Sequence, residues 1–523
     1  MGNILFLHAV GLTSYALEET IPDNGKKGGK TSAFAQLTGK IFQLPEVDRA
    51  VVLTDLPADK LQPHWTDEWG PVISKADWTV ESLLRQLQKD SEGYDNLYYV
   101  WADAPLMDVE LSAGMYRNHR RFFADYTFAD GYPRGLTPQI INPAALSQLI
   151  ELSQRHEIKA GRDYLFEVLQ KDINAFDLET EIAPTDQRML RVWLTADTRR
   201  NTEQLRRIVE AGGRDAASVQ KVLEERPELL RTYPAYVNVQ ITGGCPQSCS
   251  YCPYPSFGGD ILNRRDEMSL ENWESLLDQV RDYCGDAMIG ISAWGEPALH
   301  SRIAEIIAAV FERPGLSLTV ETSGVGWSVP VLRKIAEQYK AGTGGTAEAG
   351  ASASGLSWIV SLDSDEQQMY EQLRGPQMDE ALAAVDLLRE LFPGQVFVQA
   401  VRMKTNEDQL DRFYRRWKKK DGVEVIVQKY DSFCGELPER KVTDLSPIDR
   451  FPCWHLKRDI IVLIDGSVPM CREDIKGEYI MGNVFSENLK DVWERGAPYY
   501  LRHLKSDYPQ LCGNCDEYYT YNF

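Results

Sequence analysis

The sequence predicts an α/β protein with three successive structural units, and three observations support this. Apolar strand patterns alternate with helical patterns over residues 1–212, which is typical of a doubly wound α/β layer. Between residues 234 and 430 the strand–helix alternation recurs with six strands. A strand–turn–strand pattern and a helix follow, in a segment rich in cysteine. We expect domains at 1–212, 234–430 and 431–523, with a charged helical connector at 213–233.

The composition argues against several classes of protein. The chain has 523 residues and a net charge of −21, without a basic tract, so we expect no nucleic-acid partner. It has no apolar run long enough to span a membrane and no recognisable signal peptide, so we expect a cytoplasmic location. Nine cysteines in a reducing compartment indicate metal ligands rather than disulfides.

In the first domain, residues 4–7, 50–54 and 97–101 are predicted strands, and residues 32–44 have helical spacing. The domain resembles sugar-activating nucleotidyltransferases, above all the cytidylyltransferase-like branch. The residues that carry this likeness are Gly29-Lys30, Val51–Asp55, Asp103–Leu106 and Tyr132–Leu136.

The resemblance implies that Asp103 holds the metal on the nucleotide phosphates and that Lys30 contacts substrate. The family's glycine-rich loop with a basic residue is replaced here by His8–Thr13, which offers a poor cradle for a triphosphate. We therefore interpret the domain as degenerate, with Lys30 and Asp103 marking a vestigial nucleotide site. A sugar- or partner-binding module, or a structural unit in which Asp103 caps a strand end, is the alternative.

The second domain is organised around a short loop with three cysteines, Cys245, Cys249 and Cys252, which follows a β-branched strand over 235–242. A loop at the carboxyl end of such a strand is where α/β sheets hold ligands. Three thiolates can bind three irons of a four-iron cluster and leave one iron open. A zinc site or three unrelated thiols is the alternative. The other five predicted strands are 287–292, 317–321, 358–362, 396–401 and 424–428.

This loop resembles the signature of the radical S-adenosylmethionine (SAM) enzymes, whose fold is a partial (β/α)6 barrel. The resemblance implies that SAM binds the open iron and is cleaved reductively to a 5′-deoxyadenosyl radical, which abstracts hydrogen from a substrate. It also implies a set of SAM-binding residues at the ends of successive strands. These residues are Tyr251, Gly295, Glu296, Pro297, Ser323, Ser361, Asp363 and Arg374.

Two members of this set have alternative roles. Arg374 lies where it could reach the SAM carboxylate, to which its planar fork is suited, or where it could order the loop. Asp363 could equally be a turn-forming cap. No residue is assigned as catalytic acid or base.

A second set of cysteines follows residue 430: Cys453 and Cys471, with Gly466 between them, and the pair Cys512 and Cys515. We expect the strands around the turn at Asp465-Gly466 to form a hairpin that brings Cys453 and Cys471 together. The set resembles the SPASM/twitch domain, which implies an auxiliary [4Fe–4S] cluster. Because no cysteine follows Cys515, we expect the one-cluster form, with a structural zinc site as the alternative.

Taken together, the chain resembles the spiro-SPASM group of radical SAM enzymes, with two [4Fe–4S] clusters and SAM as cofactors. The expected electron donor is a flavodoxin or ferredoxin. We expect a sugar-like or nucleotide-linked substrate, and a peptide or protein substrate is the alternative. An iron–sulfur or zinc scaffold without catalysis and a sugar cytidylyltransferase are the hypotheses from other classes. Cys284 and Cys434 have no assigned role; a buried small side chain is the expectation for Cys284 and a structural thiol for Cys434.

Overall fold

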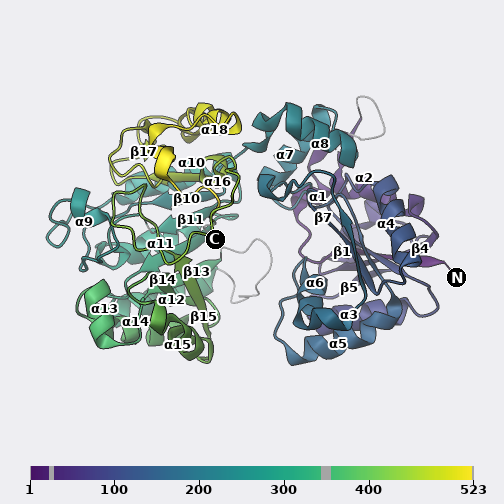
Figure 1. Cartoon of the computed structure of the whole chain (residues 1–523), viewed down its shortest axis with the longest axis horizontal. Helices are drawn as coiled ribbons and strands as arrows, with labels where there is room; N and C mark the ends of the chain where they lie inside the picture. The colour runs from purple at the N-terminus through teal and green to yellow at the C-terminus, as the bar shows by residue number, and fades with distance from the viewer. Residues whose placement is uncertain (1, 23–28, 292, 343–354, 521–523) are drawn as a thin grey trace. The chain divides into compact units, whose positions relative to one another are not determined.

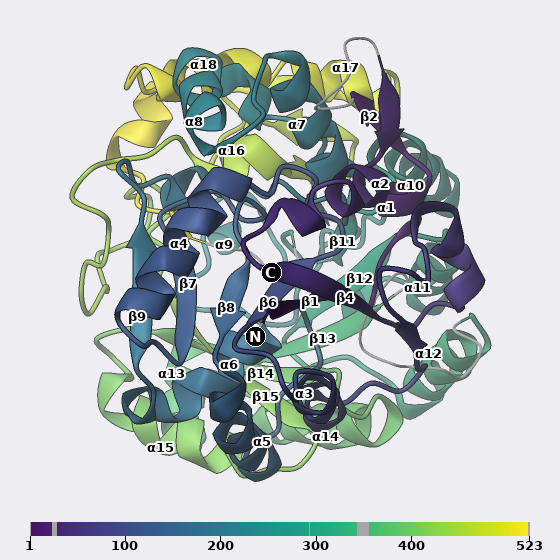
Figure 2. The same cartoon turned by 90° about the vertical axis from the view of Figure 1, so that its right-hand side faces the viewer.

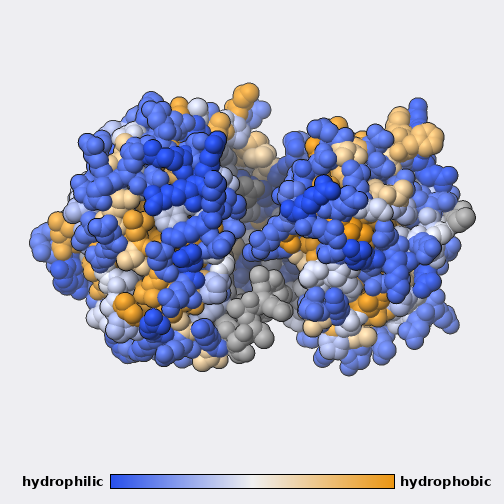
Figure 3. Space-filling model, turned by 90° about the horizontal axis from the view of Figure 1, so that it is seen from below, coloured by the Kyte–Doolittle hydropathy of each residue, from blue (hydrophilic) through white to orange (hydrophobic). Residues whose placement is uncertain are grey.

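The computed structural model describes residues 2–22, 29–291, 293–342 and 355–520 (Figure 1). The chain divides into two compact units, Met1–Thr232 and Tyr233–Phe523. No helix among the described residues combines the length and the apolar character that crossing a bilayer requires. Hydrophilic side chains predominate on the face of both units seen in Figure 3.

The first unit contains a seven-stranded sheet in the order β5-β4-β1-β6-β8-β7-β9. The strands β5, β4, β1 and β6 are parallel, and β8 runs antiparallel to both of its neighbours. The predicted doubly wound layer is therefore confirmed. The strands are β1 (Asn3–Ala9), β4 (Val47–Thr54), β5 (Val72–Ser74), β6 (Leu97–Trp101), β7 (Tyr126–Asp130), β8 (Gln139–Ile141) and β9 (Leu178–Ile182), and the ribbon β2 (Thr20–Pro22) and β3 (Lys30–Ser32) stands apart.

Helices cover both faces of this sheet. Helix α3 packs on α5 (Figure 2). Their apolar side chains join those of β1, β4 and β6 in one hydrophobic core. Helix α4 lies against β7, β8 and β9. The helices are α1 (Ser14–Leu17), α2 (Ala33–Thr38), α3 (Val80–Asp90), α4 (Val109–Arg121), α5 (Leu146–Arg155), α6 (Tyr164–Leu169), α7 (Arg199–Glu210) and α8 (Ala216–Glu225).

The second unit contains an all-parallel sheet in the order β15-β14-β13-β12-β11-β10-β16. All six predicted strands of the partial barrel are present and pair in sequence order. They are β10 (Tyr236–Val239), β11 (Met288–Ile291), β12 (Ser317–Thr322), β13 (Leu356–Ser361), β14 (Val396–Arg402) and β15 (Val423–Lys429). Parallel strands require crossover connections, and helices supply them here.

The seventh strand, β16 (Asp459–Val462), comes from the C-terminal segment and pairs with β10. The turn at Asp465-Gly466 forms, because Leu463 N donates to Ser467 O at 2.8 Å. The expected pairing of its two flanking strands is wrong, however, since β17 (Ser467–Pro469) pairs with β18 (Ile480–Asn483) instead. The apolar strand β16 is buried by adding to the sheet edge, which satisfies its backbone more fully than a short hairpin would.

The helices of the second unit are α9 (Tyr254–Phe257), α10 (Leu270–Cys284), α11 (Ile303–Phe311), α12 (Val329–Gly342), α13 (Gln367–Leu373), α14 (Met378–Leu391), α15 (Glu407–Lys418), α16 (Trp454–Arg458), α17 (Leu489–Glu494) and α18 (Ala497–Leu504). Helix α17 packs on α10, and α18 packs on α16. The C-terminal helices therefore attach to the end of the sheet that carries β10 and β16.

Candidate active site and auxiliary metal centre

The cysteine loop (residues 243–252) follows the carboxyl end of β10, as predicted. Backbone hydrogen bonds fix its path: Cys245 N donates to Ile261 O at 2.9 Å and Ser250 N to Leu373 O at 2.8 Å. The thiols of Cys245, Cys249 and Cys252 lie close enough to interact electrostatically. The structure therefore brings the three predicted cluster ligands together.

Burial, followed by nearby negative groups, raises the pKa of the Cys245 and Cys252 thiols to about 12. Three neighbouring thiols in such surroundings ionise together only when a cation offsets their repulsion and desolvation. An iron–sulfur cluster provides that positive charge, so the donor set fits this group.

The turn at the end of β11 lies against the cysteine loop. Gly295 has a φ of +86°, and a Cβ there would lie 2.2 Å from Thr242 O, so only glycine fits. The next residue, Glu296, donates its backbone N–H to Gly244 O at 2.7 Å. Gly295 and Glu296 therefore position the backbone of this turn beside the loop that carries the thiols.

The Glu296 carboxylate joins the ends of two neighbouring strands. It accepts hydrogen bonds from Thr322 Oγ1 at 2.5 Å and from Ser323 N at 2.7 Å. It also caps the short helical turn that begins at Pro297, through Ala298 N at 3.3 Å. Burial raises the pKa of this carboxyl group. The Glu296 side chain is thus a structural tie between the ends of β11 and β12.

Arg374, Asp363 and Tyr251 form a buried network behind the loop. Arg374 Nη1 lies 2.7 Å from Asp363 Oδ2 and also donates to Tyr251 Oη. Arg374 Nε donates to Gln247 Oε1 at 3.1 Å, and Asp363 Oδ1 accepts from Val401 N at 2.7 Å. Of the two predicted roles of Arg374, these contacts favour ordering of the loop. Asp363 has a φ of +65°, so its backbone conformation is that of a turn residue.

Ser361 ends β13 and is half-buried, and its hydroxyl accepts from Gln399 Nε2 at 3.4 Å. Ser323 follows β12 and is buried. The predicted SAM residues therefore come from the loop after β10, from the carboxyl ends of β11, β12 and β13, and from the helical segment after β13.

The second set of cysteines, here called the auxiliary site, consists of Cys453, Cys471, Cys512 and Cys515. All four line one cavity, and every pair among them interacts electrostatically. The same cavity is lined by His503 and Glu473. Four convergent thiols fit a four-iron cluster and would also fit zinc.

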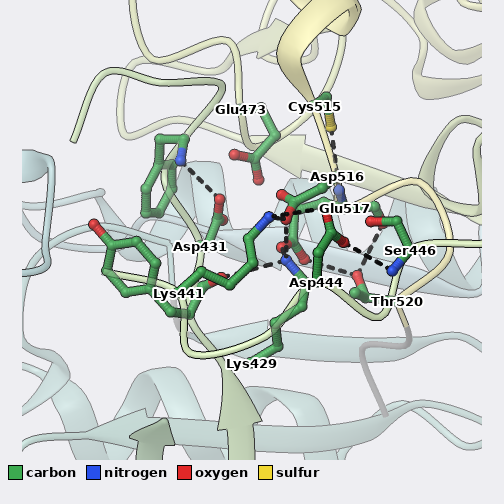
Figure 4. A network of polar contacts seen from close by, with 12 residues as sticks. Lys429, Asp431, Lys441, Asp444, Ser446, Glu473, Cys515, Asp516, Glu517 and Thr520 are labelled. Atoms are coloured by element: carbon green, nitrogen blue, oxygen red, sulfur yellow. Dashed lines mark hydrogen bonds and ion pairs between the residues drawn. The ribbon is translucent and has the colours of Figure 1, made fainter. Parts of the chain in front are cut away.

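An ion-pair network holds the chain directly after Cys515 (Figure 4). Lys429 Nζ lies 3.1 Å from Asp516 Oδ2 and also pairs with Glu517, while Lys441 pairs with Asp516. Asp431 lies in the same group of carboxylates, and its Oδ2 is 2.7 Å from Arg472 Nη2. This network ties the end of β15 to residues on either side of the auxiliary thiols.

Sequence reasoning did not place two features of the second unit. Cys434 lies within electrostatic reach of Cys515, although the two residues are 81 positions apart in the chain. Trp294 contacts three other aromatic rings, with centroid distances of 6.1 Å to Tyr254, 5.2 Å to Phe257 and 5.6 Å to Phe433. No local sequence motif predicts these long-range contacts. The signal in the sequence is a further cysteine, Cys434, which precedes the four-cysteine set.

In the first unit, the predicted vestigial site has a different environment from that of a metal site. Asp103 is buried at the end of β6, and both of its carboxylate oxygens are bound by the Arg162 guanidinium. Lys30 is exposed on β3. An arginine therefore provides the positive charge that the resemblance assigns to a metal ion.

Comparison with known proteins gives matches for both parts of the second unit. Residues 239–416 match the radical SAM superfamily, and residues 453–516 match an iron–sulfur cluster-binding domain termed SPASM. An uncharacterized protein of Treponema pallidum (strain Nichols) is 38% identical over 367 residues, which cover 69% of this chain and 99% of that protein.

A PqqA peptide cyclase of Xanthomonas euvesicatoria pv. vesicatoria (strain 85-10) is 24% identical over 308 residues, covering 54% of this chain and 80% of the cyclase. Among solved structures, a cytidylyltransferase from Leptospira borgpetersenii superposes with a TM-score of 0.34 at 14% identity, covering 44% of this chain and 95% of that one.

Proposed function

Because this chain belongs to the radical SAM superfamily and carries a SPASM domain, we propose that it cleaves SAM reductively and abstracts hydrogen from a substrate that is still to be identified. The observation that carries this proposal is the meeting of three thiols, Cys245, Cys249 and Cys252, with the Gly295 turn at the carboxyl end of one parallel sheet. These three thiols would hold a four-iron cluster, and with SAM bound beside the Gly295 turn that cluster would supply the electron for reductive cleavage of SAM and so the radical chemistry of hydrogen abstraction.

The residues of the chain then have distinct tasks. The backbone of Gly295 and Glu296 offers polar groups to the amino-acid part of SAM, with Pro297 and Ser323 fixing the turns on either side. Ser361 and the loop residue Tyr251 complete the proposed SAM surroundings. Asp363 and Arg374 hold the cysteine loop in place, because Arg374 donates a hydrogen bond to Gln247 within that loop.

For the auxiliary site we propose one [4Fe–4S] cluster bound by Cys453, Cys471, Cys512 and Cys515. With all four irons bound to protein sulfur, such a cluster has no open position for substrate, so electron transfer is its proposed role. We also propose function in a reducing compartment, with a flavodoxin or ferredoxin as the electron donor.

For the substrate, a peptide is favoured by one observation: the relative named as a PqqA peptide cyclase matches over 54% of this chain. The sugar-like or nucleotide-linked substrate rests on the predicted nucleotide site of the first unit. The Arg162–Asp103 ion pair occupies the carboxylate that the resemblance assigns to a nucleotide-bound metal. We therefore place the peptide class first.

The test is anaerobic reconstitution with iron and sulfide, followed by reduction, addition of SAM and detection of 5′-deoxyadenosine. We expect about eight irons per chain and SAM-dependent formation of 5′-deoxyadenosine. Cys249→Ala should abolish that product and lower the iron content by about four, whereas the control Cys284→Ala should change neither. A reconstituted protein that binds no iron would refute the proposal.

Substrate class is tested separately, by comparing the stimulation of 5′-deoxyadenosine formation by a random peptide library and by a panel of nucleotide sugars. Deuterium carried from the substrate into 5′-deoxyadenosine would identify the hydrogen donor. Stimulation by the nucleotide sugars alone would overturn the preference for a peptide.

A further inference from the structure

The cavity that the four auxiliary thiols line is also lined by residues with buried polar atoms that have no hydrogen-bond partner in the described part of the chain. His503 Nε2, Arg450 Nε and Nη2, and Glu473 Oε2 are such atoms. The exposed fractions of His503 and Glu473 are only 2% and 6%. Buried polar atoms are rarely left unpaired in proteins, so this cavity is built for a bound group that can pair with them.

One hydrogen bond shows which nitrogen of His503 carries a hydrogen atom. Cys453 N lies 3.4 Å from His503 Nδ1, and both groups are buried. A backbone N–H can only donate, so Nδ1 is the acceptor and the hydrogen of the ring is on Nε2. The ring also packs edge-on against Tyr508, with a centroid distance of 4.9 Å. His503 is therefore anchored to the backbone of one predicted iron ligand, and its Nε2–H is left as a donor for a group in the cavity.

Arg450 supplies further donors to the same cavity. Its guanidinium carbon lies 4.3 Å from the centre of the Tyr508 ring and 4.7 Å from that of Tyr518. These cation–π contacts hold the guanidinium in place. Nε and Nη2 nevertheless have no hydrogen-bond acceptor among the residues that the structure describes. Because Tyr508 contacts both Arg450 and His503, one aromatic side chain supports both donors.

Glu473 differs from these two residues because its carboxylate can only accept when it is ionised. Its second oxygen, Oε1, lies 3.3 Å from Arg472 Nε, so this acidic group has a charged partner of its own. The donors that remain for a group in the cavity are those of His503 and Arg450.

We propose that His503 and Arg450 donate hydrogen bonds to the sulfur atoms of a cluster at the auxiliary site and thereby raise its reduction potential. The inference rests on the proposed function, because it requires a [4Fe–4S] cluster bound by the four cysteines. The sulfur atoms of such a cluster accept hydrogen bonds, and its reduced state carries one more negative charge. Donors and a positive charge at the sulfur atoms therefore stabilise the reduced state. Neither residue binds iron, because four thiols already fill four iron positions.

The experiment is a redox titration of the reconstituted full chain, monitored by electron paramagnetic resonance, with iron and zinc counted in each sample. Every variant is made in the Cys249→Ala background, so that the auxiliary signal is observed without the signal of the other cluster. The amide of asparagine takes the place of Nδ1 of histidine, and that of glutamine takes the place of Nε2. His503→Asn therefore keeps an acceptor for Cys453 N but loses the donor to the cavity, whereas His503→Gln keeps that donor.

We expect His503→Asn to keep its iron and to shift the auxiliary potential to a more negative value, and His503→Gln to shift it less. Arg450→Met should also make the potential more negative, and the double variant should shift it further than either single one. The matched controls are His156→Asn and Arg415→Met, because both side chains are exposed on the surface, and neither should change the potential.

The outcomes separate this inference from the proposed function. Full iron with the unaltered potential in His503→Asn and Arg450→Met would overturn the inference alone, and so would a shift in His503→Gln as large as that in His503→Asn. A loss of iron in His503→Asn as large as that in Cys453→Ala would make His503 a ligand and would also overturn it. If the Cys249→Ala protein holds zinc or no metal, the auxiliary cluster of the proposed function fails, and the inference fails with it.

Discussion

The buried pair of Arg374 and Asp363 gives the sharpest prediction about the cysteine loop. The charged atoms are 2.7 Å apart, and the two side chains are 6% and 0% exposed. Replacing Arg374 by Met removes one charge and leaves the Asp363 carboxylate buried without its partner. Breaking a buried pair in this way costs about 3–5 kcal/mol, a large share of the roughly 5–15 kcal/mol that stabilises a typical domain.

The assay is urea unfolding of the cluster-free protein, monitored by the fluorescence of tryptophans in the second unit. For an m-value of about 3 kcal/mol/M, the midpoint of that unit should fall by roughly 1–1.7 M in Arg374→Met. The double variant Arg374→Met/Asp363→Asn removes both charges, and Asn tolerates the positive φ at position 363 and still accepts from Val401 N. It should therefore be more stable than Arg374→Met alone.

A second readout tests the proposed role in ordering the loop. Gln247 and Tyr251, both contacted by Arg374, lie within the loop that carries the three thiols. Arg374→Met should therefore take up less iron on reconstitution than the wild type does. The control is Arg415→Met, because Arg415 pairs with Asp411 on the surface, where both side chains are 72% exposed. The reasoning is refuted if Arg374→Met unfolds at the wild-type midpoint, or if the double variant is as unstable as the sum of the single ones.

Three further predictions concern the turn, the auxiliary site and the first unit. Gly295→Ala should lower 5′-deoxyadenosine formation more than tenfold, because its Cβ would lie 2.2 Å from Thr242 O; Gly259→Ala has a similar positive φ but open space and should leave it unchanged. Cys512→Ser should remove about four irons per chain, measured by colorimetric iron assay, and leave the iron of the radical SAM loop in place. Burial, followed by Arg162, lowers the pKa of His8 to about 3, so the folded state keeps His8 neutral while the unfolded state takes up a proton below pH 6.5. Lowering the pH from 6.5 to 4.5 should therefore cost the first unit about 2 kcal/mol at this residue, and denaturant titrations of His8→Gln should show a smaller loss, whereas the exposed control His156→Gln should behave like the wild type.

All six strands of the partial barrel, and β1, β4 and β6 of the first sheet, could be predicted because their apolar runs are short and separated by helical patterns, whereas β5, β7, β8 and β9 were not predicted. The sites at the strand ends followed from the same pattern, since parallel strands present their carboxyl ends at one edge. The pairing of β16 could not be predicted in this way. An apolar strand next to an Asp-Gly turn indicates a hairpin, but the free edge of β10 offered four residues of parallel register, Tyr236 to Val239, and that pairing prevailed.

Roles that depend on a charged partner far away in the sequence could not be predicted either. The motif around Asp103 matches a metal-binding aspartate, and only the fold shows that Arg162, 59 positions later, binds both of its oxygens. A match to a local motif predicts where the Asp103 side chain lies in the fold. It does not predict which group binds that side chain, because Arg162 lies outside the motif.

The shared sheet bears on how the two groups of thiols work together. Cys245 follows β10, and β16, the strand of the auxiliary segment, is hydrogen-bonded to β10 along its whole length. Arg472 adds a direct link, because this neighbour of Cys471 interacts electrostatically with Cys252 and with Glu321 at the end of β12. The separation of the two thiol sets is therefore fixed by backbone hydrogen bonds and the half-buried charge of Arg472 rather than by a hinged linker. Electron transfer depends on a constant separation of its centres, whereas a regulatory module needs one that changes. The construction of this unit thus favours an electron-transfer role for the auxiliary site.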